Sequence, residues 1–346
     1  MITILRWILL PISIIYYLII WFRNKLYDKK LLKSRSFSIP TIVVGNLAIG
    51  GAGKSPLTEY LIDLLKDKYK IATLSRGYGR KTKGFRIVNL NNKAIEVGDE
   101  PLQFKNKFPK ITVSVDESRC NGIELLQENH DLILLDDAYQ HRKLKPGFSI
   151  LLFDYYSINR PIICLPTGNF RDIFSSSKRA DLILITKCPS ELSINQKQLI
   201  RKKISKYSQA DVLFTQIKYR MAKSIFDHNK LIEVKNTKVL LFCGIANPEP
   251  LISYLKNQNN LVETIQFADH HNYTNSDYNK IIKHYNHLLQ KNGGIILTTE
   301  KDYQRIDITV FNNYPTYYIP IEIDFLNNGK SIFNSTIETY LKKLDK

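Results

Sequence analysis

Cysteine is scarce in this chain, and paired cysteines are missing. The 346 residues include four cysteines, none of them in a CxxC pair: Cys120, Cys164, Cys188 and Cys243. Their wide spacing argues against both a zinc site and a disulfide framework, and it indicates a reducing, cytosolic setting for the main body. Internal repeats and long low-complexity tracts are also missing. With 44% apolar and 24% charged residues, the chain is long enough to bury the cores of two ordinary domains.

Acidic residues are few relative to basic ones. The chain has 32 Asp and Glu against 50 Lys and Arg, which gives a formal net charge of +18. This excess favours an anionic partner, which could be nucleic acid, an acidic membrane surface or a phosphorylated substrate. An RNP-like aromatic pattern, a zinc finger and a dense arginine stripe are all missing. We therefore expect no nucleic-acid partner.

The N-terminus carries one apolar segment. Residues 7–22 read WILLPISIIYYLIIWF, which is shorter than the roughly 20 residues that span a bilayer. Six cations follow within residues 23–35, and anionic lipid attracts such a cluster. The sequence after the segment offers no small-residue cleavage site, which argues against a signal peptide, and the cations argue against a buried core helix. Residues 1–36 are predicted to form an N-terminal membrane helix with a basic flank; whether it spans or lies flat stays open.

A glycine-rich loop follows the first predicted strand. Residues 41–45 read as a short buried strand, and apolar residues recur at helical spacing after Ser55. Strand, glycine-rich loop, Lys-Ser and helix are the context of a phosphate-binding P-loop. The usual pattern has a glycine where this chain has Ala48. The residues predicted to hold a nucleotide are Ala48, Ile49, Gly50, Gly51, Ala52, Gly53, Lys54 and Ser55.

Carboxylates follow two later segments. Asp136 and Asp137 end a predicted buried strand, where P-loop enzymes place a carboxylate for Mg²⁺; the alternative is a solvated turn. With Ser55, they are the predicted metal ligands. Asp99 and Glu100 are expected in a turn, where a carboxylate could accept a hydroxyl proton.

The order of these motifs resembles the tetraacyldisaccharide 4′-kinase family, which acts in lipid A biosynthesis. The resemblance covers nearly the full length, and the family's own loop also lacks glycine at the place of Ala48. It rests on the apolar N-terminal helix and on the segments 40–56, 75–80, 98–103, 136–142, 171–172, 180–187, 269–271 and 299–302. The family implies transfer of the γ-phosphate of ATP, with Mg²⁺, to the 4′-hydroxyl of a tetraacylated glucosamine disaccharide 1-phosphate, giving lipid IVA.

The resemblance also implies roles for single residues. Lys54, Asp99 and His270 are the expected catalytic residues, with Asp99 as the base and His270 as its partner, although His271 stays an alternative to His270. The expected substrate residues are Arg76, Glu100, Gln140, His141 and Arg171. Two departures from the family are Asp172, where it typically has Glu, and Ala138-Tyr139, where it has Gly-Phe or Gly-Leu. The implied location is the cytoplasmic face of the bacterial inner membrane, and we expect a monomer.

The spacing of apolar runs predicts the fold class. Five such runs between residues 41 and 186 alternate with helical or loop segments, which favours a P-loop NTPase-like α/β fold with a mainly parallel sheet and helices on both faces. We expect this kinase domain over residues 37–230 and a smaller C-terminal α/β domain over residues 231–346. The rival functions are a membrane-associated P-loop GTPase or ATPase switch, although residues 185–188 lack the Asn and Asp of an Asn-Lys-x-Asp motif, and another small-molecule kinase.

Overall fold

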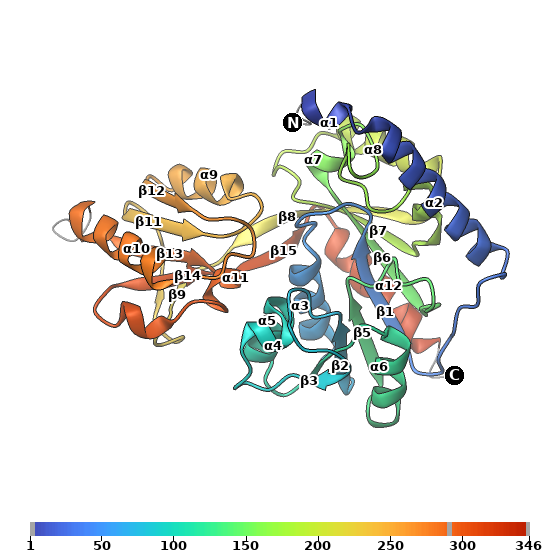
Figure 1. Cartoon of the computed structure of the whole chain (residues 1–346), viewed down its shortest axis with the longest axis horizontal. Helices are drawn as coiled ribbons and strands as arrows, with labels where there is room; N and C mark the ends of the chain where they lie inside the picture. The colour runs from blue at the N-terminus through green and yellow to red at the C-terminus, as the bar shows by residue number, and fades with distance from the viewer. Residues whose placement is uncertain (1–3, 289–292, 344–346) are drawn as a thin grey trace.

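The computed structural model describes residues 4–288 and 293–343, which form two α/β units with separate sheets (Figure 1). The strands are β1 Thr41–Asn46, β2 Ile71–Ser75, β3 Arg86–Ile87, β4 Thr112–Val115, β5 Leu132–Asp136, β6 Phe148–Asp154, β7 Leu182–Thr186, β8 Asp211–Tyr219, β9 Ala222–Ser224, β10 Leu231–Ile232, β11 Lys238–Cys243, β12 Leu261–Gln266, β13 Ile295–Thr299, β14 Thr316–Ile319 and β15 Ile321–Phe325. The helices are α1 Ile4–Trp7, α2 Leu10–Asp28, α3 Lys54–Leu65, α4 Ala94–Val97, α5 Asp99–Lys107, α6 Arg119–Leu126, α7 Tyr155–Ile158, α8 Ile194–Ser205, α9 Glu249–Asn257, α10 Asn275–Leu288, α11 Glu300–Tyr303 and α12 Gly329–Lys342. Short 3-10 helices cover residues 127–129, 174–179 and 308–311.

The larger sheet has nine strands in the order β15-β8-β7-β6-β1-β5-β2-β4-β3. Its central strand β1 pairs in parallel with β5 on one side and with β6 on the other. Strands β1, β2, β5 and β7 are buried at every residue, as expected when both faces of a parallel sheet are covered. The predicted α/β class with a mainly parallel sheet is confirmed.

Helices cover both faces of this sheet. On one face, α3, α5 and α12 contribute Leu57, Phe104 and Phe333 to the core. On the other face, α6 and α8 contribute Ile123 and Ile200. Because β1 lies in the middle of the sheet, the loop that follows it opens at the carboxyl edge between these layers, where α/β proteins place their ligands.

The smaller unit is built on a six-stranded sheet in the order β10-β9-β14-β13-β11-β12. It differs from the expected C-terminal domain 231–346 at both ends. Strands β9 and β10 join its sheet although β9 precedes residue 231, and β15 returns to the larger sheet, where it pairs antiparallel with β8. Helix α12 then packs in the larger unit. The smaller unit is therefore inserted between β8 and β15, which lie between the two units in Figure 1.

Helix α2 runs along the outside of the larger unit (Figure 1). Two polar residues on one side of it are buried: Ser13 donates a hydrogen bond to Thr167 at 2.9 Å, and Asn24 contacts Asp172. Its other faces expose large apolar side chains to solvent, among them Ile12, Ile15, Leu18, Ile19 and Phe22. Across the described ranges 4–288 and 293–343, no helix combines the length and the apolar character needed to cross a membrane.

Candidate active site

The loop after β1 has the backbone of an anion site. Gly53 has a φ of +81°, in the left-handed region that favours glycine, and it is the N-cap residue of α3. Helix α3 therefore begins at Lys54, followed by Ser55, and its first backbone N–H groups have no partner within the helix. These free donors and the helix dipole attract phosphate oxygens. Thr186, at the end of β7, donates its hydroxyl to the carbonyl of Ala52 at 2.9 Å and braces the loop.

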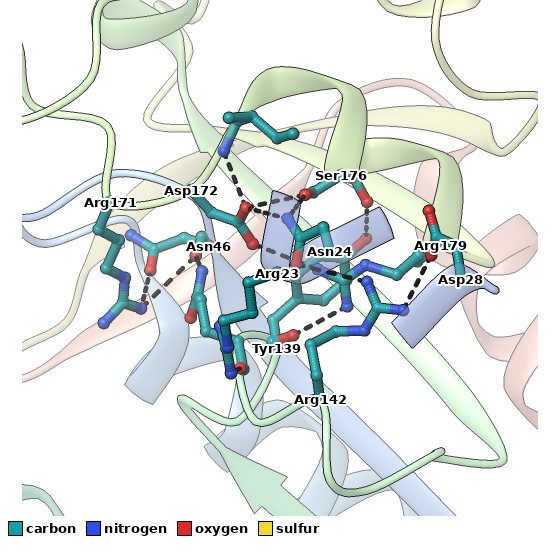
Figure 2. Close-up of polar contacts among 12 residues, drawn as sticks. Arg23, Asn24, Asp28, Asn46, Tyr139, Arg142, Arg171, Asp172, Ser176 and Arg179 are labelled. Carbon is teal, nitrogen blue, oxygen red and sulfur yellow. Dashed lines mark hydrogen bonds and ion pairs between the residues drawn. The ribbon is translucent and has the colours of Figure 1, made fainter. Parts of the chain in front are cut away.

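Lys54 lies among polar groups at the carboxyl ends of β1 and β5. Its Nζ is 3.5 Å from Oδ1 of Asn46 and 3.7 Å from Oδ1 of Asp137. Arg171 contacts the same two residues: its guanidinium donates to Oδ1 of Asn46 at 2.6 Å and pairs with the carboxylate of Asp137. Figure 2 shows Arg171 pointing to Asn46. Gln140 also donates to the backbone carbonyl of Asn46. The structure thus brings together Lys54, Asp137, Gln140 and Arg171, all of them predicted site residues.

The pKa values of the two aspartates at the end of β5 are shifted in opposite directions. Burial raises the pKa of Asp136, and the nearby charge of Glu100 acts in the same direction. Burial also opposes ionisation of Asp137, but Lys54 and Arg171 outweigh it and lower the pKa of that carboxyl. Among the described residues, the side chain of Asp136 receives a hydrogen bond from Thr58, at 3.4 Å. Asp136 is thus the carboxylate that a bound cation would stabilise most.

The donor set fits magnesium. Ser55, Asp136 and Asp137 offer hydroxyl and carboxylate oxygens, which are the ligands that Mg²⁺ prefers, and Mg²⁺ is usually held by one or two carboxylates together with phosphate oxygens. No cluster of three or more His, Cys, Asp or Glu side chains within residues 4–288 and 293–343 forms a metal site by itself. Ion pairs to Lys54 and Arg171 already engage Asp137. Ser55 and Asp136 are therefore the better candidates.

His141 and Arg76 lie beside this cluster. Burial, followed by the charge of Arg119, lowers the pKa of His141 to about 4, and Arg76 and Arg23 contribute further positive charge. The Nε2 atom of His141 is buried and has no hydrogen-bond partner among the described residues. Arg76 is exposed. The positive charge around a neutral His141 suits an anionic ligand.

A second group of predicted residues meets between the two units. Asp99 is the first residue of α5, so Asp99 and Glu100 occupy the first turn of a helix and the expected turn is wrong. The preceding Gly98 has a φ of +93°, and a Cβ there would lie 3.1 Å from the backbone of Gly77. This close approach fixes the position at which α5 begins. Oδ2 of Asp99 accepts a hydrogen bond from Nδ1 of His270 at 2.8 Å.

Positive charge surrounds Asp99. Burial opposes its ionisation, but hydrogen bonds from His270 and Arg305 outweigh burial and lower the pKa of Asp99 to about 2. Lys301 contacts Nε2 of His270 at 3.2 Å, and Arg305 contacts Nδ1 of the same ring at 3.0 Å. Lys301 also donates to Oε1 of Glu100 at 3.4 Å. The carboxylate of Asp99 is therefore ionised and oriented.

The structure distinguishes the two adjacent histidines. His270 faces Asp99 across the units, whereas His271 bonds Asp277 at 3.0 Å inside its own unit and stacks on Phe267 with ring centroids 4.7 Å apart. Of the two candidates, His270 is the partner of Asp99.

Asp172 does not join the metal side of the site. Its buried carboxylate accepts hydrogen bonds from Asn24 at 2.9 Å and from Ser176 at 2.8 Å, and it pairs with Arg179 at 3.3 Å. Figure 2 shows these contacts on the side of Asp172 that faces α2, away from Arg171 and Asn46. Asp172 therefore fixes α2 to the larger unit.

Comparison with known proteins identifies the family of this chain. The profile of the family described as "Tetraacyldisaccharide-1-P 4'-kinase" matches residues 5–342. The chain belongs to this family. It is 44% identical to the tetraacyldisaccharide 4′-kinase of Flavobacterium johnsoniae over 99% of this chain and 98% of that one. It is 39% identical to the same enzyme of Phocaeicola vulgatus, over 99% and 97% of the two chains. The crystal structure of LpxK from Aquifex aeolicus in complex with ATP aligns with a TM-score of 0.75 at 28% identity, covering 98% of this chain and 100% of that one.

Three residues of this family member's site are not among the residues predicted from the sequence. Asn46 contacts Lys54, Gln140 and Arg171; it lies within the 40–56 segment that carried part of the resemblance, but it is not among the predicted site residues. Arg305 contacts Asp99 from a segment 206 residues away in the sequence. Lys301 lies within the 299–302 segment that carried part of the resemblance, and this segment is the one signal that could have pointed to it.

Proposed function

We propose that this member of the 4′-kinase family transfers the γ-phosphate of ATP to the 4′-hydroxyl of a tetraacylated glucosamine disaccharide 1-phosphate, forming lipid IVA. Family membership over residues 5–342 makes the chain a kinase of lipid A biosynthesis. The observation that carries the site assignment is the pairing of Asp99 with His270. Glu100 follows Asp99 in the first turn of α5, and burial, followed by the charge of Glu100, raises the pKa of Asp136, which lies near Lys54. Glu100 thus lies between the P-loop residues near Asp136 and the oriented carboxylate of Asp99.

The P-loop group would hold ATP. The N–H groups at the start of α3 would cradle phosphate oxygens, and Lys54 would neutralise charge on the transferred phosphoryl group. Arg171 is near enough to Lys54 to contribute to the same neutralisation, because both contact Asn46. Ser55 and Asp136 would hold Mg²⁺, which supplies further charge neutralisation at the phosphates when bound.

Asp99 would accept the proton of the sugar hydroxyl. Its Oδ2 is engaged by His270 and Arg305, whereas its Oδ1 makes no hydrogen bond to any described residue. The hydroxyl oxygen would form the new bond to the γ-phosphorus, its proton would pass to Oδ1 of Asp99, and ADP would leave. A carboxylate with a pKa of about 2 is a weak base. Weak bases suffice in phosphoryl transfer, where the transition state is loose and positioning carries most of the catalysis.

A transfer assay tests this function. Purified protein, ATP-Mg²⁺ and a detergent-dispersed tetraacylated disaccharide 1-phosphate should yield an acceptor phosphorylated at the 4′ position, detected by mass spectrometry and by release of ADP. GTP in place of ATP and a mixture without acceptor are the controls. Release of nucleoside diphosphate that does not depend on the acceptor would instead support a nucleotide switch.

We also propose that the exposed face of α2 rests in the interface of the cytoplasmic leaflet of the inner membrane, where an acylated acceptor resides. Ile15, Ile19 and Phe22 expose 58%, 60% and 59% of their surface, and their spacing places them on one side of the helix. Asn24 and Ser13 hold the opposite side against the protein. An amphipathic helix of this kind, followed by cations, suits the surface of anionic lipid.

A triple substitution of α2 tests the membrane contact. Ile15→Ser, Ile19→Ser and Phe22→Ser together should lower binding to vesicles of anionic phospholipid by tenfold or more, because each exposed apolar side chain contributes on the order of 1 kcal/mol or more when buried in lipid. Activity on acceptor dispersed in detergent should persist. Leu125→Ser, on the exposed surface of α6, is the matched control. Co-sedimentation with vesicles measures both variants, and equal binding by the triple variant and wild type would exclude this role of α2.

A further inference from the structure

A buried ion cluster joins the two units at a distance from the proposed chemistry. Lys107, the last residue of α5, donates to Oε2 of Glu59 at 2.6 Å and lies 3.4 Å from Oε1 of Glu300. Gln103, one turn earlier on α5, donates to the other oxygen of Glu59 at 2.7 Å. Glu59, Glu300 and Gln103 are all buried. Pairing with the two glutamates outweighs burial and raises the pKa of Lys107, so the lysine is charged.

The three members of the cluster come from the three helices that carry the proposed site. Glu59 is on α3, which begins at Lys54. Lys107 is at the opposite end of α5 from Asp99. Glu300 begins α11 in the smaller unit, and it directly precedes Lys301, which contacts both Glu100 and His270. Each helix therefore carries a residue of the ion cluster and, on it or next to it, a residue of the site.

The contacts between α5 and the α11 region form one continuous seam. Asp99 with Arg305 and Glu100 with Lys301 lie toward the beginning of α5. Lys107 with Glu300 lies toward its end, where Asn106 also bonds Gln304 at 2.7 Å. Asp99 and Lys107 are eight steps of helical rise apart, a span of about 12 Å. Lys107 is thus too far away to touch the reacting atoms, but its contact with Glu300 joins α5 to the α11 region, the two elements that Asp99 and Glu100 also join.

We propose that Lys107 is a positioning residue for the phosphoryl transfer, holding α11 against α3 and α5 so that His270 stays on Asp99. This inference rests on the proposed roles of Asp99 and His270. One cation between two buried carboxylates on different units stabilises the juxtaposed arrangement, because separating the units would break the contact of Lys107 with Glu300. Oε2 of Glu300 has no hydrogen-bond partner among the described residues, and Oε1 lies within ion-pair distance of Lys107. Burial raises the pKa of Glu300 to about 7, and the charges of Lys107 and Lys223 oppose that rise.

Lys107→Met tests the proposal, because it removes the charge and keeps most of the packing of the side chain. We expect kcat to fall about tenfold while the KM for ATP stays within about twofold, since the P-loop is untouched and a small misplacement of reacting groups acts on the chemical step. Lys107→Arg should recover most of kcat. The matched control is Lys105→Met, on the same helix, because Lys105 bonds the carbonyls of Pro109 and Ile111 within its own unit. Its kcat should stay within about twofold of wild type.

Two further variants keep the test decisive. The uncharged combination Glu59→Gln, Lys107→Met and Glu300→Gln leaves no unpaired charge that could unfold the protein, and it should remain as slow as Lys107→Met. Full recovery of kcat in this combination, or equal losses in Lys105→Met and Lys107→Met, would overturn the positioning role. Asp99→Asn is measured beside them: a loss of kcat there without one in Lys107→Met rejects this inference alone, whereas no loss in Asp99→Asn rejects the proposed site.

Discussion

Asp99→Asn should lower kcat by about 10³-fold, within the range that general bases contribute, and it should leave the KM for ATP nearly unchanged. The amide keeps the shape of the side chain, so Gly98 and the start of α5 need not move. It cannot take the proton of the acceptor hydroxyl, and it no longer supplies the charge that holds His270 and Arg305. Steady-state kinetics with both substrates varied separates kcat from the two KM values.

The chain offers a matched control for this substitution. Asp277 forms a similar pair with His271 at 3.0 Å, and hydrogen bonds from His271 and Thr274 outweigh its desolvation and lower its pKa to about 2 as well. This pair lies inside the smaller unit and does not face Asp99. Asp277→Asn should therefore leave kcat near the value of wild type. A similar loss in both variants would mean that Asp99 acts through the stability of the fold.

The low pKa of Asp99 also predicts a pH profile. A carboxyl whose folded-state pKa is lowered from 3.8 to about 2 stays ionised above pH 4 and is protonated only as the pH falls toward 2. Its contribution to folding stability is therefore present above the unfolded pKa and is lost below it. Protonation of Asp99 should not limit kcat between pH 5 and 8, and a decline of kcat in that window would have to come from another group.

The local parts of this fold could be predicted from the sequence. The buried strands β1, β2, β5, β6 and β7 are continuous apolar runs, and the P-loop has a fixed spacing between strand, glycines and Lys-Ser. Helix α5 was missed because Gly98-Asp99-Glu100-Pro101 has the composition of a surface turn. The position at which α5 begins depends on the close approach of Gly98 to Gly77. These two residues are 21 positions apart, so the local sequence does not reveal their contact.

The parts that depend on distant segments could not be predicted. The return of β15 to β8 is set by strand pairing between residues about 100 positions apart, so the predicted domain boundary kept all of residues 231–346 in the smaller unit. Arg305 has the same limitation, since an isolated arginine has no spacing that marks it. The pairing of Asp99 with His270 was predicted because the family resemblance supplied both residues.

Lys54→Met should remove most of the affinity for ATP and lower kcat by a further 10²-fold or more, the size of effect expected when a preorganised cation or donor at the transition state is lost. Methionine keeps much of the side-chain volume beside Asn46 and Asp137 but supplies no charge. Lys66→Met is the control, because Lys66 is the C-cap residue of the same helix α3 and pairs with Asp63 at the surface. It should behave as wild type.

Thermal unfolding provides a second measurement that does not depend on turnover. A ligand that binds the folded state alone stabilises it by about 2.7 kcal/mol at 100 times its Kd, so ATP-Mg²⁺ should raise the Tm of wild type and of Lys66→Met. In Lys54→Met the shift should nearly vanish. Because Lys54 also lowers the pKa of Asp137, its removal should reduce the stability of the protein without ligand, most clearly at neutral pH, where that carboxyl is ionised. A full ATP-induced shift in Lys54→Met would show that the nucleotide binds elsewhere, because Lys54 is the first residue of α3, where the phosphates are proposed to bind.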